Sequence, residues 1–264
     1  MAAQEGEWNQ VSRKRGRLRH IPTTAQKPTT GGTESYSLLG LRPNPSPEFT
    51  VSDIQRHHET ACQDWQASQC WQVLQEILLA AAAAETRPTI TKAICLGPGP
   101  FDPSNGSFAA RRTAHIQTAA FRSIVKTIAG SQSCQEIKCI IQEPGFTQTD
   151  KDFCAELGLE VAETPGAFPM VDASTLVFGI HMELRTYHQA LANLPAIFIG
   201  AGLDEWKKVI DFEPGIQDLL RSISEMDATY NKYSFPDLNY MFSSTTVYWR
   251  KSEEVEVPKS SIAV

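Results

Sequence analysis

Four places in the chain carry residues able to bind a ligand directly after a short apolar run. Gly97 and Gly99 follow AICL, Glu143 follows IIQ, His181 follows LVFGI, and Gly200 ends IFIG. Glycines let a backbone turn sharply and approach a ligand closely. A carboxylate can accept hydrogen bonds from a ribose, and a histidine can act as an acid or base near neutral pH. These five residues are the predicted ligand-binding site.

The turn at the first glycine pair departs from a dinucleotide-binding loop. In the G-x-G-x-x-G pattern a third glycine would stand at the position of Asp102, and Pro98 and Pro100 lack the N–H groups that a phosphate would use. Glu143 also follows the second glycine at well beyond the roughly 20 residues of such sites. Plain turn glycines, a solvated strand-end acid and a structural histidine therefore remain alternatives to a pocket, and an S-adenosylmethionine-type pocket also remains open.

The sequence supplies no complete catalytic set by motif. It has no G-x-S-x-G and no P-loop lysine. None of its six cysteines forms a C-x-x-C pair, so neither a zinc site nor a disulfide framework is predicted, which favours a reducing compartment. His57 and His58 are neighbours that cannot share a helix face, and we expect them at the surface rather than as ligands. No catalytic residue, metal or cofactor is specified.

The elements that must position the site residues alternate between strand and helix from residue 91 onward. Such alternation predicts a Rossmann-like, doubly wound, mostly parallel α/β sheet, with an antiparallel strand at its edge as the last element. Ligands of such sheets bind beyond the carboxyl ends of the strands, where all five site residues would lie. The predicted strands are 92–97, 137–142, 159–163, 174–181, 196–202 and 245–251, and the predicted helices are 110–129, 150–157, 183–194 and a segment around 216–223.

The N-terminal part divides into a tail and a helix. Residues 1–49 are poor in apolar side chains and punctuated by proline, which predicts a disordered basic tail and linker. Thr50 or Ser52 can cap a long helix that runs to about Glu85. We expect the α/β domain to span 50–255, followed by a C-terminal tail, 256–264. We expect the two tryptophans of the long helix to be buried against the sheet, and the alternative is that they anchor a protein partner.

Charge and hydropathy exclude some partners. The net charge is −6, and a basic segment from Arg13 to Arg19 stands apart from an otherwise acidic chain. This segment is either a nuclear-import signal or contact arm, or a solvated tail, and nothing else in the chain indicates nucleic-acid binding. The longest apolar run, Ile77–Ala84, is too short to span a bilayer, and no secretory signal opens the chain. We expect a protein of the cytoplasm and nucleus whose partner is an unidentified small molecule or protein.

The ordered set of motifs resembles the SRR-like family (Sensitivity to Red Light Reduced). The similar stretches are EWNQVSRKRGR from Glu7, CLGPGPF from Cys95, EPGF from Glu143, LGLEV from Leu157, GIHMELRTYHQAL from Gly179 and IFIGAGLDEW from Ile197. The match covers most of residues 60–210. The resemblance implies a regulatory role in circadian timing or light signalling, or in haem biosynthesis or the cytoskeleton, and it implies no particular reaction.

The chain departs from the family pattern inside the predicted site. Pro100 stands where the family tends to have Ser, Glu143 where it has Asp, and Met182 where it has Cys, while Ala201-Gly202 replaces Asn-Ser. These changes remove polar side chains, so ligand chemistry shared by the family is expected to be altered here. The alternative function is a methyltransferase-like enzyme that binds S-adenosylmethionine or a related nucleoside through Gly97, Gly99 and Glu143, with His181 near the substrate.

Overall fold

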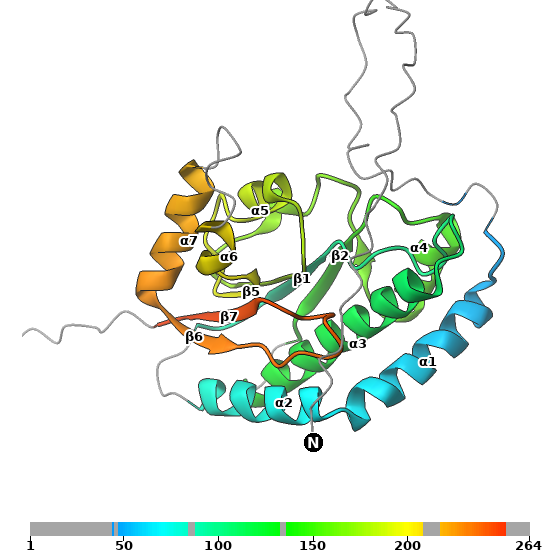
Figure 1. Cartoon of the computed structure of the whole chain (residues 1–264), viewed down its shortest axis with the longest axis horizontal. Helices are drawn as coiled ribbons and strands as arrows, with labels where there is room; N and C mark the ends of the chain where they lie inside the picture. The colour runs from blue at the N-terminus through cyan, green and yellow to red at the C-terminus, as the bar shows by residue number, and fades with distance from the viewer. Residues whose placement is uncertain (1–43, 45–46, 84–87, 133–135, 208–216, 252–264) are drawn as a thin grey trace, which may run out of the picture. The chain divides into compact units, whose positions relative to one another are not determined.

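The computed structural model describes residues 44, 47–83, 88–132, 136–207 and 217–251 (Figure 1). By its internal contacts the chain divides into two units, 1–35 and 36–264. The first unit lies outside the described residues, as do the basic segment Arg13–Arg19 and the predicted C-terminal tail. The second unit contains every helix and strand described below.

The described strands form one sheet in the order β3-β2-β1-β4-β5-β7-β6. Strands β1 to β5 run parallel, whereas β7 is antiparallel to both of its neighbours. The predicted doubly wound, mostly parallel α/β fold is thereby confirmed. The strands are β1 (Lys92–Leu96), β2 (Lys138–Gln142), β3 (Glu160–Val161), β4 (Thr175–Gly179), β5 (Ile197–Ala201), β6 (Tyr230–Ser234) and β7 (Thr245–Arg250).

Strand β6 corrects one detail of the prediction. The last strand is antiparallel, as expected, but it lies between β5 and β6 and not at the edge. The edge strand β6 was not predicted because its sequence, YNKYS, is short, only partly apolar and joined directly to the preceding helix. Its pairing with β7 holds it in place, and such tertiary pairing overrides a weak local preference.

Helices fill the connections between the strands. The predicted long helix is wrong in one respect, because it is two helices that meet at Ser68. The backbone of Ser68 is extended, and its hydroxyl donates to the carbonyl of Trp65 and accepts from the N–H of Trp71, so one residue caps both helices. The helices are α1 (Val51–Ala67), α2 (Gln69–Ala82), α3 (Phe108–Ser131), α4 (Gln148–Glu156), α5 (Leu184–Ala190), α6 (Leu203–Lys207) and α7 (Gln217–Thr229), with a 3-10 turn, η2, at Phe168–Met170.

The sheet is the middle of three layers. Helices α1 to α4 cover one face and α5 to α7 the other (Figure 1). Strand β1 shows the alternation, since Ala93 and Cys95 pack into the first core and Ile94 and Leu96 into the second. Because a central parallel strand is buried on both faces, it appears in the sequence as a continuous apolar run.

Helix α1 buries His58, which was expected at the surface, and also Trp65, for which burial was expected. His58 is 3% exposed and packs against the rings of His115 and Phe153, so its expected surface position is wrong. Trp65 is fully buried and its indole N–H donates to the hydroxyl of Ser123. The inward face of α1 therefore belongs to the core with α3, and Trp65 is not available to a partner.

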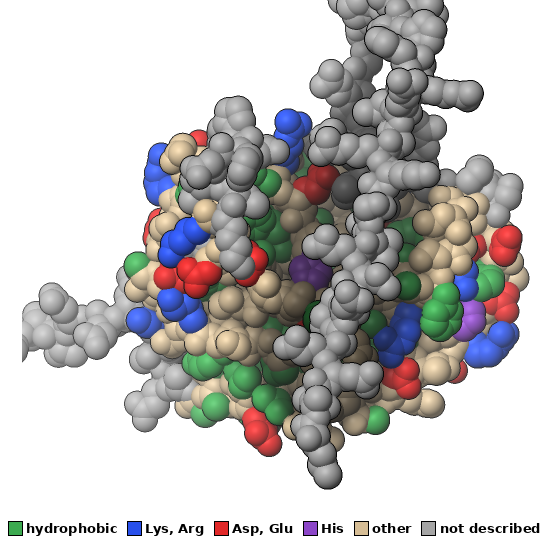
Figure 2. Space-filling model, viewed as in Figure 1, with side chains coloured by type: hydrophobic (Ala, Val, Ile, Leu, Met, Phe, Trp, Pro, Cys, Tyr) green, Lys and Arg blue, Asp and Glu red, His purple; other side chains and the backbone are tan. Residues whose placement is uncertain are grey.

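Figure 2 shows exposed hydrophobic and charged side chains over different elements. Hydrophobic side chains lie exposed along α2, including Val73 and Leu79. Opposite charges mix over α6, α7 and β6, where the described residues form the surface ion pairs Asp204–Lys207, Asp218–Arg221 and Asp227–Lys232. No helix within the described ranges is both long and apolar enough to cross a membrane.

Candidate functional site at the carboxyl edge of the sheet

The five predicted site residues come to one edge of the sheet. Leu96 of β1 is in register with Gln142 of β2 and with Gly179 of β4, so the residues that follow these three positions leave the sheet side by side. Phe178 of β4 pairs with Ile199 of β5, which brings Gly200 level with Gly179. Between β1 and β4 the strand order reverses, and such switch points are where open α/β sheets bind ligands.

Glu143 binds the protein's own main chain. One carboxylate oxygen accepts from the N–H of Gly99 at 3.0 Å and the other from the N–H of Gly145 at 2.7 Å. Burial raises the pKa of this carboxyl, and the two N–H groups oppose that shift. Glu143 therefore connects the end of β2 to the loop after β1, and both of its oxygens already have partners.

The loop after β1 is held through each of its N–H groups up to Phe101. Gly97 donates to the carbonyl of Gln142 at 2.9 Å, Gly99 to Glu143, and Phe101 to the carboxylate of Asp150 at 3.2 Å. Gly97 and Gly99 have φ angles of 60° and 91°, the left-handed region that favours glycine. The other two residues of the loop up to Phe101 are the prolines Pro98 and Pro100, which have no N–H. This is a rigid loop whose shape is set by two acidic side chains.

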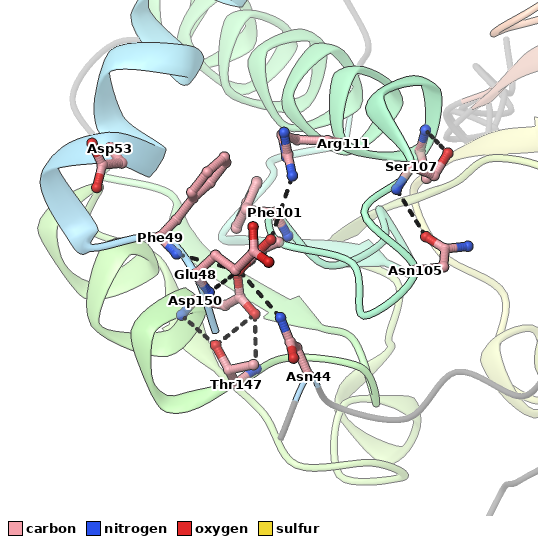
Figure 3. Close-up of polar contacts among 12 residues, drawn as sticks. Asn44, Glu48, Phe49, Asp53, Phe101, Asn105, Ser107, Arg111, Thr147 and Asp150 are labelled. Atoms are coloured by element: carbon pink, nitrogen blue, oxygen red, sulfur yellow. Dashed lines mark hydrogen bonds and ion pairs between the residues drawn. The ribbon is translucent and has the colours of Figure 1, made fainter. Parts of the chain in front are cut away.

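Asp150 is a capping residue that also reaches this loop (Figure 3). It closes a capping box at the start of α4, where one oxygen accepts from both the N–H and the hydroxyl of Thr147. Its other oxygen takes the N–H of Phe101. Burial raises the pKa of Asp150, and these hydrogen bonds oppose the shift. The sequence T-x-x-D marks the cap, but nothing local indicates its contact with the loop.

Asp102 anchors the segment before α1 to the same loop. Its carboxylate is 3.3 Å from the side-chain nitrogen of Asn44, accepts from the N–H groups of Glu48 and Phe49 at 2.8 and 3.4 Å, and pairs with Arg111 at 3.4 Å (Figure 3). The Arg111 guanidinium also lies over the Phe49 ring, 4.1 Å from its centroid. Asp102 occupies the third-glycine position of the nucleotide pattern and performs a structural task there.

His181 lies at the end of β4 in a left-handed backbone conformation, with φ of 51°. Its side chain is exposed, and Nε2 is 2.9 Å from the carbonyl oxygen of Ser243 in the loop between β6 and β7. A carbonyl can only accept, so Nε2 carries the hydrogen of the neutral ring. The structure thus orients His181 and fixes its tautomer, which sequence reasoning did not anticipate.

Met182 and Tyr187 close the space between the strand ends. A Cβ added to Gly97 would lie 2.5 Å from the thioether of Met182, so this side chain packs directly on the loop. The buried Tyr187 hydroxyl donates to the carbonyl of Gly179 at 2.6 Å and accepts from the N–H groups of Met182 and Ala201. Burial raises the pKa of Tyr187 to about 12, so this hydroxyl keeps its proton.

Gly200 has a packing reason for its identity. A Cβ there would lie 2.5 Å from the Phe198 ring and 2.8 Å from the carbonyl oxygen of Gly179. The close approach of β4 and β5 therefore requires glycine in the absence of any ligand. Glu143 is buried and contacts its own loop. The imidazole of His181, by contrast, is exposed at this edge.

The described residues include no group of three or more His, Cys, Asp or Glu side chains placed to hold a metal ion. Five cysteines lie in described segments, and all five are free thiols: Cys62, Cys70, Cys95, Cys139 and Cys154. What the edge offers chemically is a rigid loop, an oriented histidine and the apolar side chain of Met182. The strand order defines a doubly wound, Rossmann-like protein, and this edge lies at its switch point between β1 and β4.

The chain belongs to the SRR1 domain family, whose sequence model matches residues 58–249. The match runs from α1 to β7 and includes all five site residues. The resemblance found in the motifs is thus confirmed. No curated protein matches the chain.

Proposed function

We propose that this SRR1 domain protein is a regulatory protein that acts by binding a small molecule at the edge between β1 and β4. One observation carries the proposal: Glu143 and Asp150 bind the main chain of the loop at the switch point. A loop held in this way is preorganised, so little ordering free energy is lost when a ligand docks on it. The same hydrogen bonds commit the two carboxylates to structure, which favours binding over acid–base catalysis.

The resemblance to SRR-like proteins suggests the setting of this regulation. Circadian timing, light signalling and haem biosynthesis are the processes that it implies, and we place the protein in the cytoplasm and nucleus. The segment Arg13–Arg19 is the candidate import signal. Deleting residues 12–20 tests this part by itself, because an unchanged nuclear level of the deletion variant would contradict import through the arm.

A methyltransferase-like enzyme is the second candidate, and the strand order supports it. An antiparallel seventh strand inserted between the fifth and sixth strands of a doubly wound sheet is the arrangement found in S-adenosylmethionine-dependent methyltransferases, and β7 lies in that place here. The topology alone does not establish the activity, because one fold hosts many functions. The acidic residue at the end of β2, which could bind a ribose, is Glu143, and it is hydrogen-bonded to Gly99 and Gly145.

A thermal-shift screen of the full chain separates the two candidates. The compounds tested are S-adenosylmethionine, adenosine, haem and tetrapyrrole precursors. A ligand present at 100 times its dissociation constant adds about 2.7 kcal/mol to the free energy of unfolding. A shift with S-adenosylmethionine, followed by methyl transfer to an acceptor, would support the enzyme. A shift with another compound and no turnover would support the regulatory protein.

Two exposed histidines supply the site variant and its control. His181 lies at the proposed edge, whereas His188 is in the last turn of α5. The stabilising ligand should bind more weakly to His181→Gly and equally well to His188→Ala. A ligand that binds all three proteins equally well would show that the site lies elsewhere.

A further inference from the structure

We propose that the edge between β1 and β4 selects an uncharged or cationic ligand that donates a hydrogen bond to Nδ1 of His181, and that it excludes phosphate groups. The inference rests on the function proposed above and specifies the ligand class of the same site. It follows from the partners that the N–H groups of the loop already have, and from Nδ1 of His181, for which the described residues supply no partner.

The loop after β1 has no N–H group left for a phosphate between Gly97 and Phe101. Phosphate sites of α/β folds are built from free main-chain N–H groups of such a loop. Here Gly97, Gly99 and Phe101 donate to Gln142, Glu143 and Asp150, and the two prolines between them have no N–H. A phosphate would have to break these bonds and leave buried acceptors unsatisfied.

Three N–H groups at the neighbouring strand ends are engaged in the same way. The N–H of Gly145, after β2, is held by Glu143 at 2.7 Å. The N–H groups of Met182, after β4, and Ala201, at the end of β5, both lie against the hydroxyl of Tyr187. That hydroxyl donates its own hydrogen to a carbonyl. The N–H groups of Gly145, Met182 and Ala201 are thus as unavailable to an anion as those of the loop.

The charge at the loop also disfavours an anion. Glu143 and Asp150 lie directly behind it, and within the described residues neither carboxylate forms an ion pair with a lysine or arginine. The nearby Arg111 pairs with Asp102, and Lys151 of α4 pairs with Glu163. A phosphate here would meet uncompensated negative charge in partly desolvated surroundings, where repulsion is strong.

His181 supplies the polar group that a ligand can use. Because Nε2 donates to the Ser243 carbonyl, Nδ1 of the neutral ring is an acceptor, and it has no hydrogen-bond partner in the part of the chain described. The left-handed backbone at this residue is a conformation that other side chains adopt at a cost, and functional sites are where such strain gathers. Beside it, Met182 gives an apolar surface over Gly97 and Gly179. The matching ligand has an apolar body and an N–H or O–H group.

Amide NMR of the full chain tests the exclusion of phosphate. Inorganic pyrophosphate is titrated while the amide resonances of Gly97, Gly99 and Phe101 are followed. We expect these resonances to stay in place, because their N–H groups are already bonded. Saturable shifts of the three resonances would overturn the exclusion.

Imidazole nitrogen NMR tests the acceptor. The expected spectrum assigns hydrogen to Nε2 of His181 and a free lone pair to Nδ1, with His188 as the exposed reference histidine. A spectrum that places hydrogen on Nδ1 would overturn the proposed acceptor role. Both NMR measurements examine the edge itself, so they decide the ligand class whether or not a natural ligand has been found.

Matched pairs of compounds, with and without a phosphate group, test whether the proposed class of ligand binds. Nucleosides and amines are compared with their phosphorylated forms on wild type, His181→Gly and His188→Ala. We expect hits only among the unphosphorylated partners, weakened about tenfold by His181→Gly, as the loss of one hydrogen bond implies. A monophosphate that binds as tightly as its nucleoside would contradict the inference. An absence of any hit would count against the proposed function and leave the two NMR results to decide the chemistry of the edge.

Discussion

The N–H of Gly99 donates to the carboxylate of Glu143 over 3.0 Å, and this bond joins the loop after β1 to the end of the neighbouring strand β2. The same carboxylate holds Gly145. The sequence suggests Glu143 as a hydrogen-bond acceptor for a ligand. In the structure Glu143 also holds the loop on which a ligand would bind. Predictions about stability and about binding meet at this residue.

Glu143→Ala should lower the free energy of unfolding by about 3 kcal/mol, because it leaves one buried N–H group, that of Gly145, and one partly buried N–H group, that of Gly99, without an acceptor. Glu143→Gln retains one acceptor oxygen and should cost less. Chemical denaturation measures both. Glu160→Gln is the control, since Glu160 forms only an exposed ion pair with Lys138 and should change stability by less than about 1 kcal/mol. Equal costs for Glu143→Ala and Glu160→Gln would contradict the supporting role.

Gly97→Ala should destabilise the fold by about 2 kcal/mol, since an L side chain at a φ of 60° costs about 1–2 kcal/mol and the new Cβ would displace Met182. In a Met182→Ala background the steric part disappears. The double-mutant cycle should then show a coupling free energy of at least about 0.5 kcal/mol. Additive effects would mean that Met182 does not rest on the loop.

Two substitutions of His181 separate the effect of backbone strain from the effect of losing the imidazole. His181→Gly relieves the strain, whereas His181→Ala retains it, so the glycine variant should be more stable than the alanine variant by about 1 kcal/mol. Urea denaturation of the two variants makes the comparison. Both variants should lose the same amount of ligand affinity, because both lack the imidazole. If only one of them lost affinity, the backbone and not Nδ1 would be responsible.

Acid should destabilise the contact between α1 and α3. Burial lowers the pKa of His58 to about 4 and that of His115 to about 3. In the unfolded chain both rings take up a proton near pH 6.5, which the folded chain resists. The stabilisation is therefore complete above pH 6.5 and is lost as the pH falls towards 4 and 3, by about 1.4 kcal/mol per pH unit for each ring.

His115→Phe tests this account, because a phenyl ring suits the site beside Phe101 and Phe153 and does not titrate. Denaturant melts across pH 7 to 5 should show a smaller loss of stability in the variant than in wild type. Glu143 and Asp150, whose pKa values are raised by burial, contribute with the opposite sign in both proteins, so the difference isolates the histidine. Parallel pH curves for the two proteins would refute the assignment.

Asp102→Ala should release the segment before α1. The buried carboxylate of Asp102 accepts from the N–H groups of Glu48 and Phe49 and pairs with Arg111. Hydrogen exchange at the Glu48 and Phe49 amides should accelerate by at least about tenfold, the effect of losing about 1.4 kcal/mol. Amides in the middle of α1 serve as the internal reference. Unchanged exchange at Glu48 and Phe49 would show that other contacts hold the segment.

The sequence by itself determined the fold class, because its signals are local. Buried parallel strands such as β1 and β4 appear in the sequence as continuous apolar runs. The end of α4 is marked by Gly158, whose φ of 73° favours glycine. The order of the motifs also indicated the family that the sequence model confirms. Their position at strand ends predicted that Gly97, Glu143 and His181 would share an edge, and the strand register brings them there.

Tertiary structure alone decided what each group at that edge binds. Whether Glu143 faces a ligand or the loop, which atom of His181 is free, and where Met182 packs depend on contacts between residues far apart in the chain. The pairing of β6 with β7 and the burial of His58 against α3 are decided in the same way. Hydrogen-bond partners and packing neighbours depend on distances in space, and residue types and local spacing do not encode those distances.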